Sequence, residues 1–283
     1  MNQPSPVSPG TAAIPERMQT LTPVQFRNEV RRGLWRQPTS GCCVGYTQLN
    51  LVILPSRYAD DFHQFCRQNP KPCPLLEVVK GGGYEAKKLA PGSDLRTDLP
   101  GYKVFRATEV ELRSDVTDLW QDDFVSFLIG CSFTFENALL KENVPVRHIE
   151  CGCNVPMYLT NIACRPAGPF TGQLVVSMRP IPAALVEKAY RITGRYPAVH
   201  GAPVHHGNPA AIGIGDLSRP DFGDPVPVRD GEVPVFWACG VTPQAALMNV
   251  APELAITHAP GYMFVSDYRD EEFQDRQGDF SEV

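Results

Sequence analysis

Four short polar segments of this 283-residue chain carry the residue types that acid–base and carboxylate chemistry requires. Most of their histidine, arginine, cysteine and amide side chains sit near glycine or proline, whose tight turns let side chains from separate loops converge. We expect these segments to meet in one cleft between domains. The alternative is that each histidine only satisfies a nearby loop carbonyl. The segments are residues 147–150, 199–207, 237–244 and 257–261.

Histidine suits general acid or base catalysis because its ordinary pKa of about 6.5 allows both protonation states near neutral pH. Cys239 is a further catalytic candidate, since a helix predicted to begin at residues 242–243 would present its N-terminal amides and lower the pKa of the thiol. The competing interpretation of Cys239 is a small buried thiol at the end of a strand. The histidine candidates are His148, His200, His205 and His258.

Two arginines and three neutral polar residues are candidates for substrate binding. Arg147 and Arg179 each carry a planar fork that can hold both oxygens of a carboxylate, although a surface salt bridge would explain either residue equally well. Asn154, Thr242 and Gln244 could donate hydrogen bonds to a developing oxyanion without titrating. These five residues are the predicted substrate-binding set.

The sequence predicts neither a metal site nor an organic cofactor. His200, His205 and His206 lie within seven residues, but an extended segment 204–206 directs neighbouring side chains to opposite faces, so His205 and His206 could not readily bind one ion. The Cys151-Gly152-Cys153 sequence lacks a second close cysteine pair, which argues against a structural zinc site there. Residues 213–215 begin like a dinucleotide loop, but Ser218 occupies the third glycine position.

The elements expected to position these side chains alternate between strands and helices. Helices are predicted from Thr22 onward, at 58–67, at 182–192 and from residue 242, and one or two buried helices are predicted around Cys131 from the spacing of residues 120–139. Extended runs are predicted at 49–54, 75–79, 102–105, 146–149, 156–160, 174–178 and 233–238. This pattern indicates an α/β fold class, a mixed layered α/β domain with an inserted, smaller two-layer α+β domain.

We place the inserted domain at 141–224 and the α/β domain at 20–140 plus 225–268. The segments 1–19 and 269–283 are predicted to be a flexible N-terminus and a loose C-terminal tail. We identify no internal repeat in the sequence.

Composition narrows the classes of partner and compartment. A net charge of −5, with basic residues scattered along the chain, disfavours a nucleic-acid partner. The apolar runs are too short for a membrane helix and residues 1–15 do not resemble an export signal, so we expect a cytoplasmic protein that does not bind membranes. Nine cysteines without framework spacing favour reduced thiols. Assembly into a homo-oligomer stays open.

Several long strings along the chain resemble, in order, the signatures of the D-glutamate cyclase family, whose bacterial members are named hydro-lyases. They span about residues 20–268. The resemblance implies a two-domain α/β architecture with an inserted α+β domain, and a lyase activity, most concretely the dehydrating cyclisation of D-glutamate to 5-oxo-D-proline. The strings are 130–136 (GCSFTFE), 147–150 (RHIE), 154–158 (NVPMY), 175–180 (VVSMRP), 200–205 (HGAPVH), 236–244 (FWACGVTPQ) and 258–261 (HAPG).

Cyclisation requires a base for the α-ammonium, an acid for the departing oxygen and a stabiliser of the oxyanion, and the candidates above supply all three types. The expected partner is therefore a small-molecule carboxylate. Two alternatives stay open. One is dehydration of another small amino or hydroxy acid through loss of an α-proton. The other is a non-catalytic protein that binds a small carboxylate through the same arginines.

Overall fold

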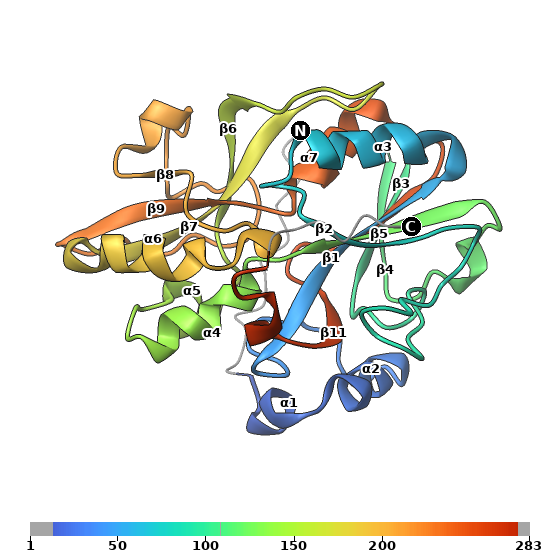
Figure 1. Ribbon diagram of the computed structural model, residues 1–283, viewed down its shortest axis with the longest axis horizontal. Coiled ribbons are helices and arrows are strands. Elements are labelled where there is room, and N and C mark those ends of the chain that lie inside the picture. Colours follow the sequence, from blue (N-terminus) through green and yellow to red (C-terminus); the bar gives the residue numbers. More distant parts are fainter. Residues whose placement is uncertain (1–13, 108, 277–283) are drawn as a thin grey trace, which may run out of the picture.

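Two antiparallel sheets lie side by side in this protein, with helices packed around them (Figure 1). The computed structural model describes residues 14–107 and 109–276. The first sheet has the order β2-β5-β1-β10-β3-β4, with β11 also paired to β1, and the second has the order β6-β7-β9-β8. The first sheet contains β1 (Tyr46–Pro55), β2 (Leu75–Val79), β3 (Tyr102–Arg106), β4 (Glu109–Arg113), β5 (Phe124–Gly130), β10 (Ala255–His258) and β11 (Phe264–Arg269). The second contains β6 (Met157–Ala163), β7 (Gln173–Pro182), β8 (His205–His206) and β9 (Glu232–Ala238).

The helices confirm the predicted α/β class. The α-helices are α1 (Glu16–Thr20), α2 (Pro23–Arg31), α3 (Ser56–Gln68), α4 (Phe133–Lys141), α5 (Arg147–Cys151), α6 (Val186–Gly194) and α7 (Thr242–Val250). Short 3-10 turns are η1 (Thr117–Leu119), η2 (Ala183–Leu185), η3 (Pro197–Val199), η4 (Pro209–Ile212) and η5 (Asp270–Phe273). None of the helices within residues 14–107 and 109–276 has the length and apolar character needed to cross a membrane.

The central strand β1 is buried on both faces. Leu49, Leu51 and Ile53 join a core that also contains residues of α4, α6, β7 and β9. Val52 and Leu54 point to the other face and pack with residues of α3 and α7. Alternate side chains of one strand therefore enter two cores. Because the first core includes residues of both sheets, it ties the two sheets together.

The two sheets are built from the same unit, which the sequence alone did not reveal. Strand β1 pairs antiparallel with β5 from Leu49↔Gly130 to Pro55↔Phe124. Strand β7 pairs antiparallel with β9 from Val176↔Ala238 to Pro182↔Glu232. A shift of 127 residues carries β1 onto β7, and a shift of 108 residues carries β5 onto β9, with the register kept at both ends. The short strands β2 and β8 pair with the outer sides of β5 and β9.

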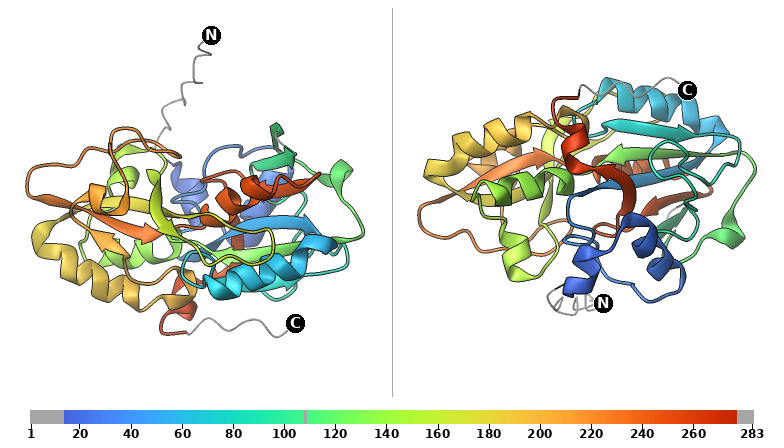
Figure 2. Two further views of the ribbon diagram at one scale, coloured as in Figure 1. Left: turned by 90° about the horizontal axis from the view of Figure 1, so that it is seen from above. Right: turned by 60° about the horizontal axis from the view of Figure 1, so that its bottom comes forward.

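The helices that follow these strands cross between the two units. Helix α4 follows β5 and packs with α6 of the second unit in the shared core, and α7 follows β9 and packs with α3 of the first unit. In Figure 1, α3 and α7 lie together near the upper right, and α4 and α6 lie together on the left. Figure 2 shows α3 in cyan and α6 in yellow toward opposite ends of the molecule. The arrangement approximates a two-fold rotation of one unit onto the other.

Two local predictions were wrong. Of the one or two buried helices expected around Cys131 from the spacing of residues 120–139, α4 is present, but residues 124–130 form strand β5, whose residues are all buried. A strand buried on both faces loses the alternation that would identify it, so its aromatic residues mimicked helical spacing. The extended run expected at 146–149 is instead largely the short helix α5.

The strand predicted at 233–238, which we placed in the α/β domain, lies in the second sheet as β9. Strand β9 pairs with β7 and β8, and the chain returns to the first sheet only with β10 and β11. The domain boundaries at 141 and 224 stay a prediction. Of the two terminal segments predicted to be loose, residues 1–13 and 277–283 lie outside the described residues. The remaining parts contain α1, the end of β11 and η5.

Candidate functional site

A buried carboxylate, Glu136, lies between a guanidinium and an imidazole where the two sheets meet. Glu136 is on α4, Arg179 on β7 and His148 on α5. Arg179 donates from Nε to Glu136 Oε1 at 3.1 Å, and Nη2 also donates to this oxygen. Nε2 of His148 lies 3.1 Å from the same oxygen. The side chains of Arg179 and His148 are fully buried, and that of Glu136 is 5% exposed.

Two serines and two aromatic rings hold the arginine in place. Nη1 of Arg179 donates to Ser177 Oγ, and Nη2 donates to Ser132 Oγ, both at 3.1 Å. The guanidinium also lies over the rings of Phe135 and Trp237, 5.5 and 5.3 Å from the ring centroids. Most of the fork is thus occupied by the protein itself. The second N–H on Nη1 makes no hydrogen bond to the residues that the structure describes.

The charges of this cluster keep Glu136 ionised. Burial alone would raise the pKa of the carboxyl, because a dry environment disfavours the charged form. The nearby His148 and Arg179 outweigh that effect and hold the pKa of Glu136 below its ordinary value. The cluster therefore contains a permanent buried anion, compensated by Arg179 and in contact with a ring that can accept a proton.

Cys131 and Cys239 border this cluster. Burial raises the pKa of Cys239 to about 11, although the Val241 amide and the positive charge of Arg179 oppose the shift. Burial also raises the pKa of Cys131 well above its ordinary value, while the Phe133 amide opposes it. Both residues are therefore thiols near neutral pH. The helix amides that were expected to lower the pKa of Cys239 are present, but burial dominates.

His200 lies near Gly130, the residue directly before Cys131. Its Nδ1 lies 2.8 Å from the Lys71 carbonyl oxygen, so this nitrogen carries the proton and donates it. Burial lowers the pKa of His200 to about 4, and the positive charges of Lys71 and Arg179 act in the same direction. Its Nε2 has no hydrogen-bond partner among the described residues. His200 is therefore a neutral, buried ring with one open nitrogen.

Close packing at Gly130 fixes the turn that carries Cys131. A Cβ atom at Gly130 would lie 2.6 Å from the Ala198 carbonyl oxygen and 2.7 Å from Val199 Cγ1. We expect Gly130→Ala to destabilise the protein by about 1–3 kcal/mol, because the backbone of η3 would have to move. Thermal unfolding measures this effect. Gly215→Ala is the control, because nothing lies within 4 Å of the added atom, and an equal loss in both variants would contradict the packing argument.

Arg147 does not reach the buried cluster through any contact that the described structure shows. It is also buried, but its Nη2 pairs with Glu232 and its Nε lies 3.2 Å from Glu150. It lies on α5 directly before His148. The arrangement indicates that Arg147 fixes α5 against the start of β9.

His258 and Gln244 form a second buried pair on the first sheet. The amide of Gln244 lies 3.2 Å from each ring nitrogen of His258 and donates to its carbonyl oxygen at 3.0 Å. The backbone N–H of Leu51 donates to Nδ1 at 3.1 Å. Burial lowers the pKa of His258 to about 4. Thr242 lies nearby in the chain but its hydroxyl bonds to the backbones of Val175 and Cys239.

Asn154 and His205 also contact other parts of the protein. Asn154 Nδ2 donates to the Pro260 carbonyl oxygen at 3.2 Å. His205 Nε2 lies 2.8 Å from the Asn208 carbonyl oxygen, and its ring stacks on Phe236 at 5.8 Å. The structure thus brings together His148, His200, Arg179 and Cys239 of the ten predicted site residues. Thr242 bonds to the backbone of Cys239, and the other five occupy hydrogen bonds or ion pairs elsewhere.

His205 and His206 point to opposite faces of β8, as extended backbone requires. His205 packs on Phe236, and His206 lies 3.0 Å from the hydroxyl of Tyr190 on α6. No group of three or more potential ligands for a metal ion occurs in residues 14–107 and 109–276.

Four members of the cluster were missed as site residues: Cys131, Ser132, Glu136 and Ser177. The first three lie in the 130–136 string, and Ser177 lies in the 175–180 string. Glu136 is the one acidic side chain on α4, a helix that otherwise buries mainly apolar residues and threonine. An isolated acid in such a helix is costly to bury without a partner, and that was the signal available in the sequence.

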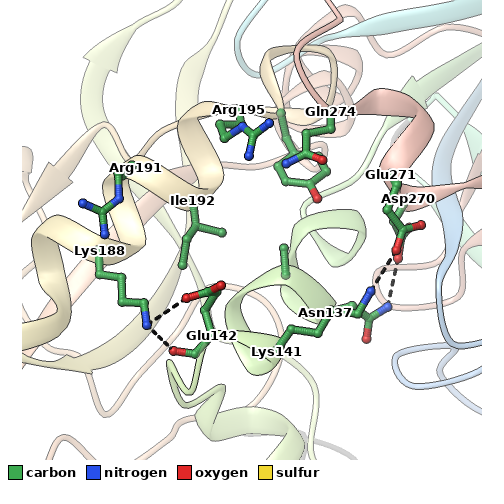
Figure 3. Close-up of a pocket in the computed structure, with 12 residues that line it drawn as sticks. Asn137, Lys141, Glu142, Lys188, Arg191, Ile192, Arg195, Asp270, Glu271 and Gln274 are labelled. Carbon is green, nitrogen blue, oxygen red and sulfur yellow. Dashed lines mark hydrogen bonds and ion pairs between the residues drawn. The ribbon is translucent and has the colours of Figure 1, made fainter.

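A separate groove of about 450 Å³ lies between α4, α6 and η5 (Figure 3). None of the predicted site residues lines it. Lys188 reaches Glu142 across one end, and Asn137 donates to Asp270 at 2.9 Å at the other. The groove is charged on both sides, and three of its cations, Lys141, Lys188 and Arg195, pair with acids.

Asp270 in this groove gives a prediction about pH. Burial raises its pKa to about 7, and the nearby Glu271 acts in the same direction. An acid with a raised pKa in the folded state stabilises the fold at low pH, and this contribution of up to about 4 kcal/mol is lost as pH rises from about 4 to about 7. Asp270→Asn should therefore gain stability relative to the wild type over that range. Urea unfolding at several pH values measures the difference, and a difference independent of pH would contradict the assignment.

Comparison with known proteins places the chain in a family. The family model described as D-glutamate cyclase matches residues 125–267, about half of the chain. A relative from Saccharopolyspora erythraea is 61% identical over 254 residues, covering 89% of this chain and 99% of its own. A relative from Stutzerimonas stutzeri is 57% identical over 253 residues, covering 89% and 96%, and one from Bacillus subtilis is 56% identical over 252 residues, covering 89% and 98%. All three are named "Putative hydro-lyase".

Similarity to a solved structure is much weaker. A nitrogen repressor-like protein from Methanococcus jannaschii aligns with 86% of this chain and 97% of its own at 10% identity, with a TM-score of 0.36. The identity and coverage of the curated relatives, together with the family match across β5 to β11, show that this chain belongs to the D-glutamate cyclase family.

Proposed function

We propose that this protein is a hydro-lyase that removes water from a small carboxylic acid, most concretely in the cyclisation of D-glutamate to 5-oxo-D-proline. The names of the relatives support the reaction class, and the description of the family supports the substrate. The observation that carries the proposal is the buried, ionised Glu136 in ion-pair contact with His148, neither of whose ring nitrogens makes a hydrogen bond among the described residues.

The proposed reaction needs two proton transfers and one stabilised anion. The α-ammonium loses one proton before the amine attacks the γ-carboxyl carbon and a second after the C–N bond forms, and one carboxyl oxygen receives both protons and leaves as water. His148 accepts each proton in turn at its open Nδ1 and passes it to the departing oxygen. Glu136 stabilises the imidazolium that forms between these steps and keeps the ring oriented.

Arg179 and two helix termini favour the negative charge that develops on the substrate. The free N–H on Nη1 of Arg179 is positioned to bind an oxygen, and helices α4 and α7 begin within three residues of Cys131 and Cys239. Helix N-termini favour anions because their amides are unpaired. Burial strengthens these interactions, since little water screens them. The carboxylate is thus the group that the site is suited to hold.

The test is incubation of the purified protein with D-glutamate, followed by chiral detection of 5-oxoproline. We expect 5-oxo-D-proline as the first product with the wild type and no 5-oxoproline with Glu136→Gln, with L-glutamate as the stereochemical control. Loss of one water from a different small acid, without reaction of glutamate, would identify a dehydratase of that acid. Thermal stabilisation by D-glutamate without product would identify a binding protein, and both outcomes would overturn the cyclase assignment.

A further inference from the structure

Two thiols occupy equivalent positions in the two repeated units. Cys131 directly follows β5, and Cys239 directly follows β9. The shift of 108 residues that carries β5 onto β9 also carries Cys131 onto Cys239, and it carries Thr134 onto Thr242 at the start of the following helix. The equivalence of the two thiols thus follows from the strand register.

The contacts around these turns bring them to the junction of the two units. Asn50 of β1 lies against the second turn, where a Cβ atom at Gly240 would be 2.1 Å from Asn50 Nδ2. Asn50 also donates from Nδ2 to the Gly130 carbonyl oxygen at 2.7 Å, in the first turn. Its equivalent, Ser177 of β7, is joined to Ser132 of the first turn through Arg179. Each turn is therefore held by both units.

The two thiols share one environment. They belong to one apolar cluster with Phe133, Val241 and Met263, and each is only slightly exposed, 7% for Cys131 and 8% for Cys239. Each sulfur accepts the backbone N–H of the residue two positions later, Phe133 or Val241, and Arg179 contributes positive charge to both. These groups would stabilise a thiolate formed transiently at either position.

Buried polar atoms beside the thiols lack a partner. Nδ1 of His148 and Nε2 of His200 have no hydrogen-bond partner among the described residues, and both residues are 1% exposed. The ring of His148 stacks on Phe133 at 6.2 Å between centroids, and His200 borders the Gly130 carbonyl. Open nitrogens this deeply buried are expected to face a ligand, since an unsatisfied polar atom otherwise costs free energy.

We propose that Cys131 and Cys239 are an acid–base pair on opposite faces of the substrate's α-carbon, and that the protein inverts the configuration of a 2-amino acid or of the lactam formed from it. The substrate class rests on the proposed function. Two equivalent groups related by an approximate two-fold rotation face a ligand between them from opposite sides. That is the arrangement required to remove a proton from one face of a carbon and deliver another to the opposite face.

The step is balanced without an oxidant, reductant or second substrate. One sulfur, as the thiolate, takes the proton from the α-carbon, and the electron pair of the C–H bond moves into the adjoining carboxyl group as an enolate. The N–H groups of Arg179 and of the helix termini favour that charge. The opposite thiol then donates its proton to the α-carbon, so the two sulfurs exchange roles. The first thiolate forms by loss of a proton to solvent, and the Phe133 or Val241 amide and the charge of Arg179 favour it.

The test follows the α-proton by NMR in D2O, with D-glutamate, L-glutamate and both enantiomers of 5-oxoproline. We expect the wild type to replace the α-proton by deuterium and to produce the opposite enantiomer. Cys131→Ser and Cys239→Ser should each slow inversion by about 100-fold or more. Each variant should keep exchange with only the enantiomer whose α-proton faces the remaining thiol, and the double variant should lose both.

Cys151→Ser is the control, because this cysteine is exposed, and melting curves show whether each variant folds. Formation of 5-oxoproline with the α-proton retained, and with unchanged rates in both cysteine variants, would overturn the thiol pair and leave the cyclase assignment standing. Exchange without cyclisation would support the pair and contradict the cyclase assignment. Absence of exchange in all four compounds would overturn the pair, whatever the result of the cyclisation assay.

Discussion

Replacing Glu136 with Gln is expected to destabilise the protein by about 3–5 kcal/mol and to stop turnover. The substitution keeps the size of the side chain but removes the charge that compensates Arg179, which is fully buried and cannot recover its hydration. The same change removes the anion that stabilises a protonated His148. A loss of this size should lower the melting temperature by roughly 6–20 °C in a chain of this length.

A double variant separates the charge argument from a simple packing defect. Arg179→Met in the Glu136→Gln background removes the uncompensated cation, so the pair of changes should cost less than the sum of the single changes. Denaturant unfolding of the wild type and three variants gives the coupling. Glu253→Gln is the matched control, because Glu253 pairs with Arg57 on the surface and such pairs contribute little. Additive losses, or a Glu136→Gln protein as stable as the wild type, would contradict a buried charge cluster.

Much of the secondary structure could be predicted because local pattern decides it. The run 49–54 became β1, and the apolar spacing of residues 58–67 became α3. Helix α2 begins after Thr22, as predicted, and the threonine and Gln25 form a reciprocal cap there. In contrast, residues 124–130 were misread because burial on both faces of β5 comes from tertiary packing, which the local pattern does not report.

The repeated unit could not be predicted because few residues repeat. Some equivalent positions of the two units carry the same residue, such as Pro55 and Pro182 or Leu139 and Leu247. Other equivalent positions differ, such as Val52 and Arg179. Packing requires only that apolar volume be kept, so the two copies diverge while the strand register is retained. The register, which is a property of the fold, makes the relationship visible.

The site was predicted in part for a similar reason. Residue type identified His148 and Arg179, because imidazole and guanidinium groups have obvious chemistry. It also selected His205 and Arg147, which have the same chemistry but contact other groups. Glu136 was missed because an acid has no distinctive meaning until its neighbours are known. Glu136 and His148 lie close to Arg179 because α4 and α5 pack against the second unit. No local sequence pattern contains that packing.

His148→Asn and His205→Asn are expected to separate these two classes of histidine. Loss of the His148 ring should lower kcat by about 10²–10⁴, because it removes the group that moves the proton while Asn fills a similar volume. His205→Asn should leave kcat nearly unchanged, since this side chain contacts Asn208 and Phe236 at the edge of the second sheet.

Steady-state kinetics with 5-oxoproline detection measures both variants, and melting temperatures establish that each remains folded. A merely structural role for His148 would lower stability without a selective loss of kcat, and it would not change the pH profile. A catalytic role in proton transfer predicts that the pH profile of the residual activity changes when the imidazole is removed. Equal loss of kcat in both variants would show that β8 reaches the substrate, and the site would then have to extend from the buried cluster to the edge of the second sheet.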